Sequence, residues 1–525
     1  MSFSSDDDIS YWGILRNGVP SILNNAAAPT ALQLNLAIFS QVGGPEWMAA
    51  YAVVQSTVTF CQGMFNFLLY IPMASIAHAV GQKLHGGQQV IKMRVTFALL
   101  AGIVLGIICT VCLCWSILGW SCIVPLLGGD SIIDSSSSSS SSSTILVCDG
   151  TVLKIMNIAN DIRPLVILYL WGRVPSILLV FVNNVCTGIL VGKQRVRLVT
   201  SINVLTNILD VTGNAIVLLL RKKQQGNLYQ AGLATSAATV VGTVLILPLA
   251  IYLAAPSNYN EEEEREHDNN TSVIHLSRES KEKDHTSFSV RDFIFSSLNM
   301  IARSVLLQGA MYLLSILSSR IGTSVLAAHQ VVMQIWCLIS LFCDGFADVG
   351  TMVGARLLGA GKHEQLLVLT NRLLVFAMVA GTVCGTILLL CQESIIEVFT
   401  TATEANDDTQ TVLRSVWMLT ALMQPLNALV FVSDGLLFAH QAFSFIRNLM
   451  FIGVLAIFVP LLWIGYSTKH TLLALWIAKS LLTSWRAIAA FWFFWGYQRK
   501  HYCGDSTDPG DKKVPITTER SVLLP

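Results

Sequence analysis

The chain has 525 residues, of which 53% are hydrophobic and only 12% are charged. Soluble proteins carry about 25% charged residues, so this composition excludes an ordinary soluble protein and predicts an integral membrane protein. The net charge of +1 gives no electrostatic basis for a nucleic-acid partner. The twelve cysteines are scattered mostly through apolar segments, so they predict neither a disulfide framework nor a metal site.

Twelve apolar stretches are long enough to cross a bilayer, since about 20 helical residues span its hydrocarbon core. The first six are expected at about residues 11–40, 48–80, 91–118, 164–190, 199–220 and 231–255. The second six are expected at about residues 293–319, 325–357, 366–390, 412–439, 446–464 and 472–495. Pro20 and Pro29 both fall in the first stretch, which we expect to be bent or broken because proline frees a backbone carbonyl of the helix.

The two halves of the chain resemble each other. When the second half is laid over the first, one block aligns Gly81 with Gly359, and a later block aligns Pro175 with Pro425. The offset of the later block is smaller, which indicates an insertion in the first half, where nine consecutive serines begin at Ser135. A duplicated membrane domain with its pathway between the halves is the usual build of a secondary transporter.

The expected fold is therefore an all-α integral membrane protein, with twelve transmembrane helices in two pseudo-symmetric six-helix lobes. The N-terminal lobe covers residues 1–256 and includes a serine-rich outer loop at about 119–162. A polar linker at 257–290 leads to the C-terminal lobe at 291–498, and a tail follows at 499–525. The linker is too polar to bury a core of its own.

Lysine and arginine in the short loops predict the orientation in the membrane. The loops after the second, fourth and eighth helices carry Lys83, Arg195 and Arg356, whereas the loop after the first helix has no lysine or arginine. Both termini and the linker are therefore expected in the cytoplasm, and the multi-pass protein is expected in a plasma membrane or an organelle membrane. The linker sequons at Asn269 and Asn270 are accordingly expected to stay unglycosylated.

The serine-rich loop is expected on the opposite, oxidising side. Cys122 and Cys148 bracket its serine run. We expect these two cysteines either to form a disulfide that closes the loop or to remain free thiols near helix ends.

Several blocks of the second half have a familiar order and spacing. Residues 318–322 (Ser-Ser-Arg-Ile-Gly) and 326–330 (Leu-Ala-Ala-His-Gln) resemble the seventh and eighth helices of the MATE (multidrug and toxic compound extrusion) family. Residues 424–428 (Gln-Pro-Leu-Asn-Ala), with Asp434 and Gly435, resemble the tenth helix of its DinF-like branch. The resemblance covers roughly residues 12–497, and it implies an exporter with a central cavity that exchanges a cytosolic organic solute for inward H⁺ or Na⁺.

The first half shows both agreement with this family and departures from it. Asn203 and Asp210 resemble the ends of the fifth-helix pattern Asn-x-x-Asn-x-x-x-Asp, with Thr206 at the second Asn position. Many relatives have an Asp in the first helix where this chain has Asn35, and a neutral amide cannot take up a proton. The Glu that the plant and some bacterial branches carry in the seventh helix is Gln308 here, which favours the DinF-like branch.

Carboxylates deep in the expected helices are candidate functional groups, because a charge at mid-membrane costs about 2.5–3.5 kcal/mol on insertion scales. In the repeat, Asp344 corresponds to Asn66 and Asp434 to Asn184, so the second lobe is acidic where the first is neutral. We expect Asp210 and Asp434 to be the principal titrating groups, with Asp344 as a partner. The expected ion-coupling and cavity residues are Asp210, Asp434, Asp344, Asn35, Asn203, Thr206, Asn184 and Gln308. The structural alternative is that each Asp only accepts hydrogen bonds from neighbouring helices.

Three candidate positive charges lie deep inside the expected helices: Arg173, Arg303 and Lys479. If Arg303 or Lys479 pairs with an acid, that acid is removed from proton transfer. His329 is interpreted as a hydrogen-bonding residue near a helix end rather than as a titrating group.

The predicted function is secondary active antiport of organic solutes such as drugs, toxins or metabolites by alternating access. An acid-bearing cavity suits organic cations, the coupling ion is H⁺ or Na⁺, and no cofactor is expected. The expected partners are a small organic substrate and the lipid bilayer, with a functional monomer. Another two-lobe carrier, either major-facilitator-like or a lipid flippase, remains an alternative. A membrane-embedded enzyme is disfavoured because the ten histidines are dispersed, without catalytic or metal-ligand spacing.

Overall fold

The computed structural model describes residues 9–82, 87–118, 162–220, 226–254, 290–401 and 407–502. All regular structure within these ranges is helical, as predicted. The N-terminal lobe contains α2 (Tyr11–Met64), α3 (Phe67–Gln82), α4 (Gly87–Leu118), α7 (Arg163–Gly192), α8 (Val196–Leu220) and α9 (Gly226–Ala254). The C-terminal lobe contains α12 (Val290–Ile321), α13 (Thr323–Gly359), α14 (His363–Leu390), α15 (Gln392–Thr401), α16 (Asp407–Leu422), α17 (Gln424–Ala439), α18 (Phe443–Ile452), the π-helical segment η2 (Gly453–Phe458), α19 (Val459–Lys469) and α20 (Leu472–Tyr502).

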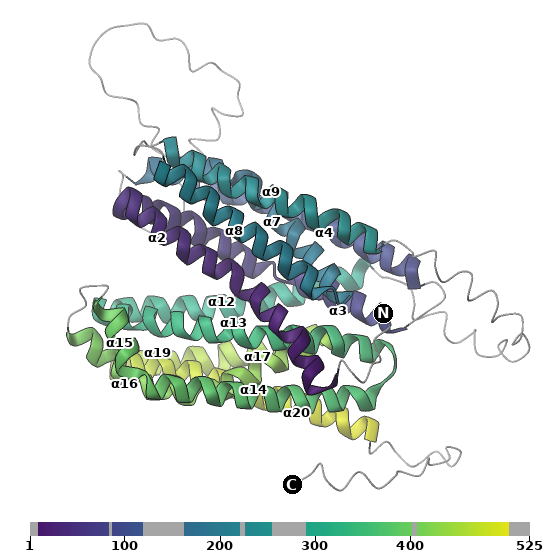
Figure 1. The fold of residues 1–525 in the computed structure, drawn as a ribbon. Coiled ribbons are helices and arrows are strands. Elements are labelled where there is room, and N and C mark those ends of the chain that lie inside the picture. Colours follow the sequence, from purple (N-terminus) through teal and green to yellow (C-terminus); the bar gives the residue numbers. More distant parts are fainter. Residues whose placement is uncertain are drawn as a thin grey trace, which may run out of the picture.

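The two lobes lie side by side as separate bundles (Figure 1). In the described part of the chain, ten helices are long and apolar enough to cross a membrane, or eleven if α16 and α17 form one bent span. The protein is therefore a multi-pass membrane protein. The serine run, Cys122, Cys148 and the sequons at Asn269 and Asn270 lie outside the described residues.

Helix α2 covers the first expected crossing and the first part of the second, which α3 completes in the span Glu46–Gln82. A straight helix of its 54 residues would be about 81 Å long, far more than a bilayer core of about 30 Å. The ring centroids of Phe39 and Tyr51 are nevertheless only 4.7 Å apart, and the Tyr51 hydroxyl reaches the carbonyl of Leu32 at 3.5 Å. Twelve residues along a straight helix span about 18 Å, so α2 turns back on itself between Phe39 and Tyr51 and begins the second crossing. Neither Pro20 nor Pro29 interrupts the helix, so the expectation of a break there is wrong.

Prolines do shape the second lobe. The expected helix at 412–439 is divided into α16 and α17, which meet at an angle of 53°. Pro425 lies in the first turn of α17, where its ring fits but cannot continue a helix from before it. The expected helix at 446–464 is likewise divided, because η2 inserts a π-helical segment just before Pro460.

The lobes meet where α13 packs against α2 and α3. A Cβ on Gly81 would lie 2.0 Å from the carbonyl oxygen of Arg356, and a Cβ on Gly359 would lie 2.0 Å from that of His78. The alignment of the two halves that pairs Gly81 with Gly359 also pairs His78 with Arg356, so the two contacts are equivalent in the repeat. Four buried alanines lie between the lobes in the same region: Ala74, Ala77, Ala355 and Ala439.

Candidate ion-coupling and solute site

Asp210 in α8 is the centre of a polar cluster inside the N-terminal lobe. Its carboxylate accepts hydrogen bonds from the Nδ2 atoms of Asn35 at 2.8 Å and of Asn214 at 3.0 Å. Asn214 Nδ2 also lies 3.2 Å from Asn35 Oδ1 and 3.1 Å from Thr235 Oγ1. Asn35 and Asn214 are buried, whereas Asp210 is half-buried. The structure thus brings together Asn35 and Asp210, two predicted site residues that lie 175 positions apart.

Asn214 and Thr235 were missed in the sequence. Asn214 follows Asp210 by four residues and therefore lies on the same helix face, a spacing that could have identified it. Thr235 comes from α9 and carries no local signal. The Oδ1 atom of Asn214 is buried and has no hydrogen-bond donor, which leaves one acceptor of the cluster unsatisfied.

A cation and three aromatic rings lie next to this cluster. Arg173 donates to Gln55 Oε1 at 2.9 Å and to the Tyr169 hydroxyl at 3.1 Å. The Tyr169 ring packs against those of Phe39 and Tyr51, with centroids 5.5 Å away in both cases. Neutral acceptors therefore surround this buried guanidinium, and no ion pair joins it to Asp210 among the described contacts.

A chain of amide hydrogen bonds connects α8 with the second lobe. Asn203 donates to Asn24 at 2.7 Å, Asn24 donates to Asn25 at 3.4 Å, and Asn25 donates to Asp348 Oδ2 at 3.0 Å. Ser21 donates to the same carboxylate oxygen at 2.8 Å. The chain runs from α8 through α2 to α13, so Asp348 holds the two lobes together by hydrogen bonds. Asn203 thus belongs to this chain rather than to the cluster around Asp210.

The remaining predicted residues lie outside both networks. The Thr206 hydroxyl donates to the Ile202 carbonyl of its own helix at 2.9 Å and lies against Gly242 of α9. Gln308 of α12 lies against Gly63 of α2 at the contact between the lobes. Asn184 is half-buried on α7 and is not part of the Asp210 cluster.

Asp434 lies in the C-terminal lobe between two arginines. Its Oδ2 atom accepts from Arg303 Nη2 at 2.6 Å and from Arg486 Nη2 at 2.7 Å. Two guanidinium groups stabilise the ionised carboxylate, so this geometry argues against the expectation that Asp434 takes up protons. Arg486 was missed in the sequence. Asp344, one turn before Asp348, has no hydrogen-bond partner among the described residues.

We expect Asp434→Ala to lower the free energy of unfolding by about 3–5 kcal/mol, because it leaves two buried arginines without their counter-ion. The measurement is thermal unfolding of the purified protein in detergent. Glu393→Ala is the matched control: its pair with Arg414 is also 2.7 Å long, but the side chains are 66% and 48% exposed. That loss is expected to leave the melting temperature nearly unchanged, because exposed ion pairs contribute little to stability. Equal melting temperatures for Asp434→Ala and the parent would show that the pair is not stabilising.

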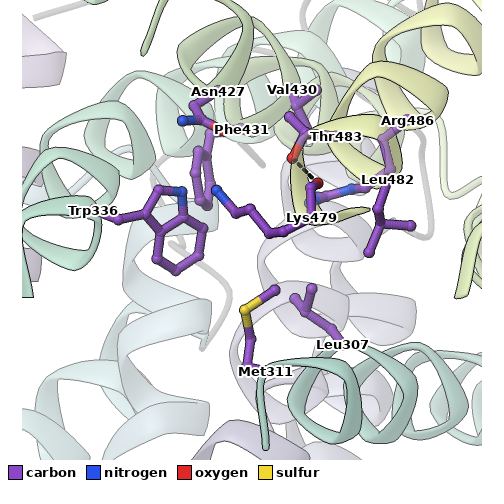
Figure 2. A pocket seen from close by; sticks show the side chains of 10 residues that line it. All are labelled: Leu307, Met311, Trp336, Asn427, Val430, Phe431, Lys479, Leu482, Thr483 and Arg486. Carbon is purple, nitrogen blue, oxygen red and sulfur yellow. Dashed lines mark hydrogen bonds between the residues drawn. The ribbon is translucent and has the colours of Figure 1, made fainter. Parts of the chain in front are cut away.

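A pocket lies between α12, α13, α17 and α20 of the C-terminal lobe, and Arg486 forms part of its wall. Its volume is about 10 Å³, which is room for about one water molecule. It is lined by Leu307, Met311, Trp336, Asn427, Val430, Phe431, Lys479, Leu482, Thr483 and Arg486 (Figure 2). Apolar and aromatic walls with a few polar groups are typical of small-molecule sites, but such sites have volumes of about 300–1,000 Å³.

The chain is similar in sequence and in fold to several known proteins. The family model MatE matches residues 300–464. The chain is 29% identical over 202 residues to Protein DETOXIFICATION 42 of Arabidopsis thaliana, and the match covers 38% of each protein. It therefore spans little more than a third of the length of this plant relative.

Two bacterial proteins match over nearly the whole chain. DNA damage-inducible protein F of Escherichia coli is 21% identical over 502 residues, which is 94% of this chain and 93% of that protein. The crystal structure of a mutant of the Vibrio cholerae MATE transporter VcmN superposes with a TM-score of 0.69 at 12% identity. That superposition covers 93% of this chain and 95% of the other, and at this identity it shows a shared fold.

Proposed function

We propose that the chain is a member of the MATE family, which it resembles in sequence, and that it is a secondary active antiporter for small organic solutes. It exports them from the cytoplasm by alternating access, as a monomer in the bilayer, in exchange for H⁺ or Na⁺. The observation that carries the proposal is the Asp210 cluster: a half-buried carboxylate held by two buried asparagines inside a helical lobe.

The cluster supports ion binding because one of its hydrogen-bond acceptors has no donor. Asn214 Oδ1 is buried without a donor, and such an atom costs free energy unless a partner is supplied. A proton on Asp210 would be one such donor. A sodium ion would instead bind the oxygens of Asp210, Asn35, Asn214 and Thr235, which is the oxygen ligand set that hard cations prefer.

Coupling to the alternation of the lobes follows from the shared helix α8. Ion binding at Asp210 acts on the same helix that carries Asn203, seven residues earlier. Asn203 is the first donor of the amide chain that ends on Asp348 in the other lobe. We assign the coupling role in the second lobe to Asp344 and Asp348, since Asp434 is neutralised by its two arginines.

The test is transport by the purified protein in liposomes, with the pH gradient and the Na⁺ gradient imposed separately. Labelled organic cations, organic anions and a fluorescent phospholipid serve as candidate solutes. We expect solute movement that is driven by one gradient and abolished when that gradient is collapsed. Movement of every solute that ignores both gradients would overturn antiport, and gradient-independent movement of the phospholipid alone would identify a lipid flippase.

A further inference from the structure

The interior of the N-terminal lobe contains two opposite charges, Asp210 of α8 and Arg173 of α7. The other Asp, Glu, Lys and Arg residues of its six described helices lie near the start of a helix or in the turn of α2: Arg16, Glu46, Lys92, Arg94, Arg163 and Arg197. Helices α3 and α9 contain none. Within the described part of the lobe, Asp210 and Arg173 are therefore each other's only interior counter-charge.

Arg173 is buried, with 6% of its surface exposed, and its described hydrogen-bond partners are all neutral. Its Nε atom donates to the Ser176 hydroxyl at 3.1 Å. Its Nη1 atom donates to Gln55 at 2.9 Å and to Tyr169 at 3.1 Å. A buried charge is costly unless an opposite charge compensates it. Asp210 supplies that compensation, because the two groups are near enough to interact electrostatically.

A row of neutral groups keeps the two charges apart. The Tyr169 hydroxyl lies within hydrogen-bonding reach of Thr235. Thr235 Oγ1 accepts from Asn214 Nδ2 at 3.1 Å, and the same nitrogen donates to Asp210 Oδ1 at 3.0 Å. The guanidinium of Arg173 therefore attracts the carboxylate across neutral side chains, without an ion pair between them among the described contacts.

Arg173 is the fixed charge that acts on this cluster. The neighbouring helices α2 and α7 present two further titratable side chains to it, Tyr51 and Tyr169, and α9 has no charged residue. Phenols are neutral at physiological pH. Because Asn35 in the first helix is also neutral, the interior of the lobe has no net charge when Asp210 is ionised. It carries one positive charge when an ion is bound.

We infer that Arg173 sets the affinity of the Asp210 cluster for the coupling ion. This inference rests on the proposed function and names a residue that regulates its ion site. H⁺ and Na⁺ each add one positive charge to the cluster, so the guanidinium repels both and weakens their binding. Weaker binding serves transport, because a half-buried carboxylate without a nearby cation would release the ion slowly. Arg173 does not contact Asp210, and it acts on the ion only through its charge.

Two substitutions remove this repulsion in different ways. Arg173→Gln removes the charge. Gln55→Glu neutralises it in place, because the new carboxylate would lie where Gln55 Oε1 now accepts from Arg173 at 2.9 Å. In both variants we expect the concentration of H⁺ or Na⁺ that gives half the maximal export rate to fall about tenfold, the size expected for removing one charge from a protein interior. The measurement is the initial export rate in liposomes at a series of concentrations of the coupling ion.

Two other substitutions show whether the charge is responsible. Arg173→Lys keeps the charge, so its half-maximal concentration should stay close to that of the parent. Arg197→Gln removes a cation from the exposed start of α8, where water and salt screen it, and should change nothing. A fall in Arg173→Lys equal to that in Arg173→Gln would show that the shape of the side chain controls ion affinity, and the inference would be wrong.

Ion binding can also be followed without transport. A bound ion raises the melting temperature of the purified protein, and the part of this rise that Asp210→Asn abolishes belongs to the cluster. The midpoint of that part should move to an ion concentration about tenfold lower in Arg173→Gln and in Gln55→Glu. Unshifted midpoints in both variants, or a rise that does not depend on Asp210, would overturn the inference even if gradient-driven export is found. Shifted midpoints in a protein without gradient-driven export would establish the role of Arg173 and overturn the antiport.

Discussion

Asp210→Asn is expected to reduce gradient-driven export at least about tenfold while the protein remains folded and inserted. Asparagine keeps the size of the side chain but cannot bind a proton, and it weakens the attraction for a sodium ion. It also offers one acceptor where the carboxylate now accepts from both Asn35 and Asn214. The measurement is the initial rate of solute export in liposomes under an imposed gradient, with thermal unfolding as the check on folding.

The response of the export rate to a pH gradient tests whether Asp210 binds the coupling proton. If H⁺ is the coupling ion, the driven rate of the parent rises with the proton gradient, because protonation of the Asp210 carboxylate on one side and its release on the other completes the cycle. In Asp210→Asn the remaining rate should not respond to that gradient. Asp408→Asn is the matched control, since this aspartate is exposed at the start of α16 and should transport at the parental rate.

Introducing a second acid beside Asp210 is a further test of the cluster around Asp210. Asn35→Asp places a second carboxylate within hydrogen-bonding reach of Asp210, where Asn35 Nδ2 now lies at 2.8 Å. Two acids that close titrate as a coupled pair, so the pH dependence of export should change. If Asp210→Asn exports solute at the parental rate under both ion gradients, the coupling site lies outside this cluster. Asp344 would then be the next carboxylate to test.

The helices were predictable from the sequence because their signal is local. An apolar stretch of about 20 residues has few alternatives to a membrane helix, and the observed helices follow the expected ranges closely. The return of the chain between the first two crossings was also predicted, since the expected ranges end at 40 and begin again at 48, and the contact between Phe39 and Tyr51 agrees with it. The prolines had opposite outcomes: Pro425 begins a new helix after a 53° bend, whereas α2 continues through Pro20.

The contacts within the candidate site were only partly predictable from the sequence. Asp210 was identified from a pattern along one helix, and its partner Asn35 from a position in the first helix. The state of Asp434 depends on Arg303 and Arg486, which are 131 and 52 positions away, and no spacing rule connects them. The sequence allowed either Arg303 or Lys479 to pair with an acid, and only the structure shows that Arg303 does so, together with Arg486, at Asp434. Long-range pairing thus decides which charges are free to act, although the sequence shows which charges are buried.

The contact between α3 and α13 supports the second large effect. Gly81→Ala and Gly359→Ala should each reduce export at least about tenfold. In either variant the new Cβ would lie 2.0 Å from a backbone carbonyl oxygen of the other lobe. A backbone atom cannot rotate out of the way as a side chain can, so the helices must separate by roughly the shortfall from an ordinary contact of about 3.5–4.0 Å. The expected consequence is an opening of the lobes at this end, which the lysine and arginine distribution places on the cytoplasmic side.

Accessibility reports this opening directly. Ala355 is fully buried between the lobes, so a cysteine introduced there by Ala355→Cys should react slowly with a membrane-impermeant maleimide. Its rate is obtained by subtracting the labelling that the native cysteines give in the parent protein. Added to Gly81→Ala, the same substitution should react faster. Gly309→Ala in α12 is the control, because a Cβ there would meet no atom within 4 Å; it should change neither labelling nor export.

The internal repeat of the chain predicts that the two glycine variants behave alike. The contact of Gly81 with Arg356 and that of Gly359 with His78 occupy equivalent positions in the two halves of the chain, so both glycines serve one two-fold crossing of α3 and α13. The two alanine variants should therefore lower export and raise labelling to a similar extent, and their combination should exceed either one by less than the sum, because the helices need to separate only once. Slow labelling and parental export in both variants would show that this crossing is not a moving seal. A large effect from only one of them would show that the two halves of the crossing have different roles.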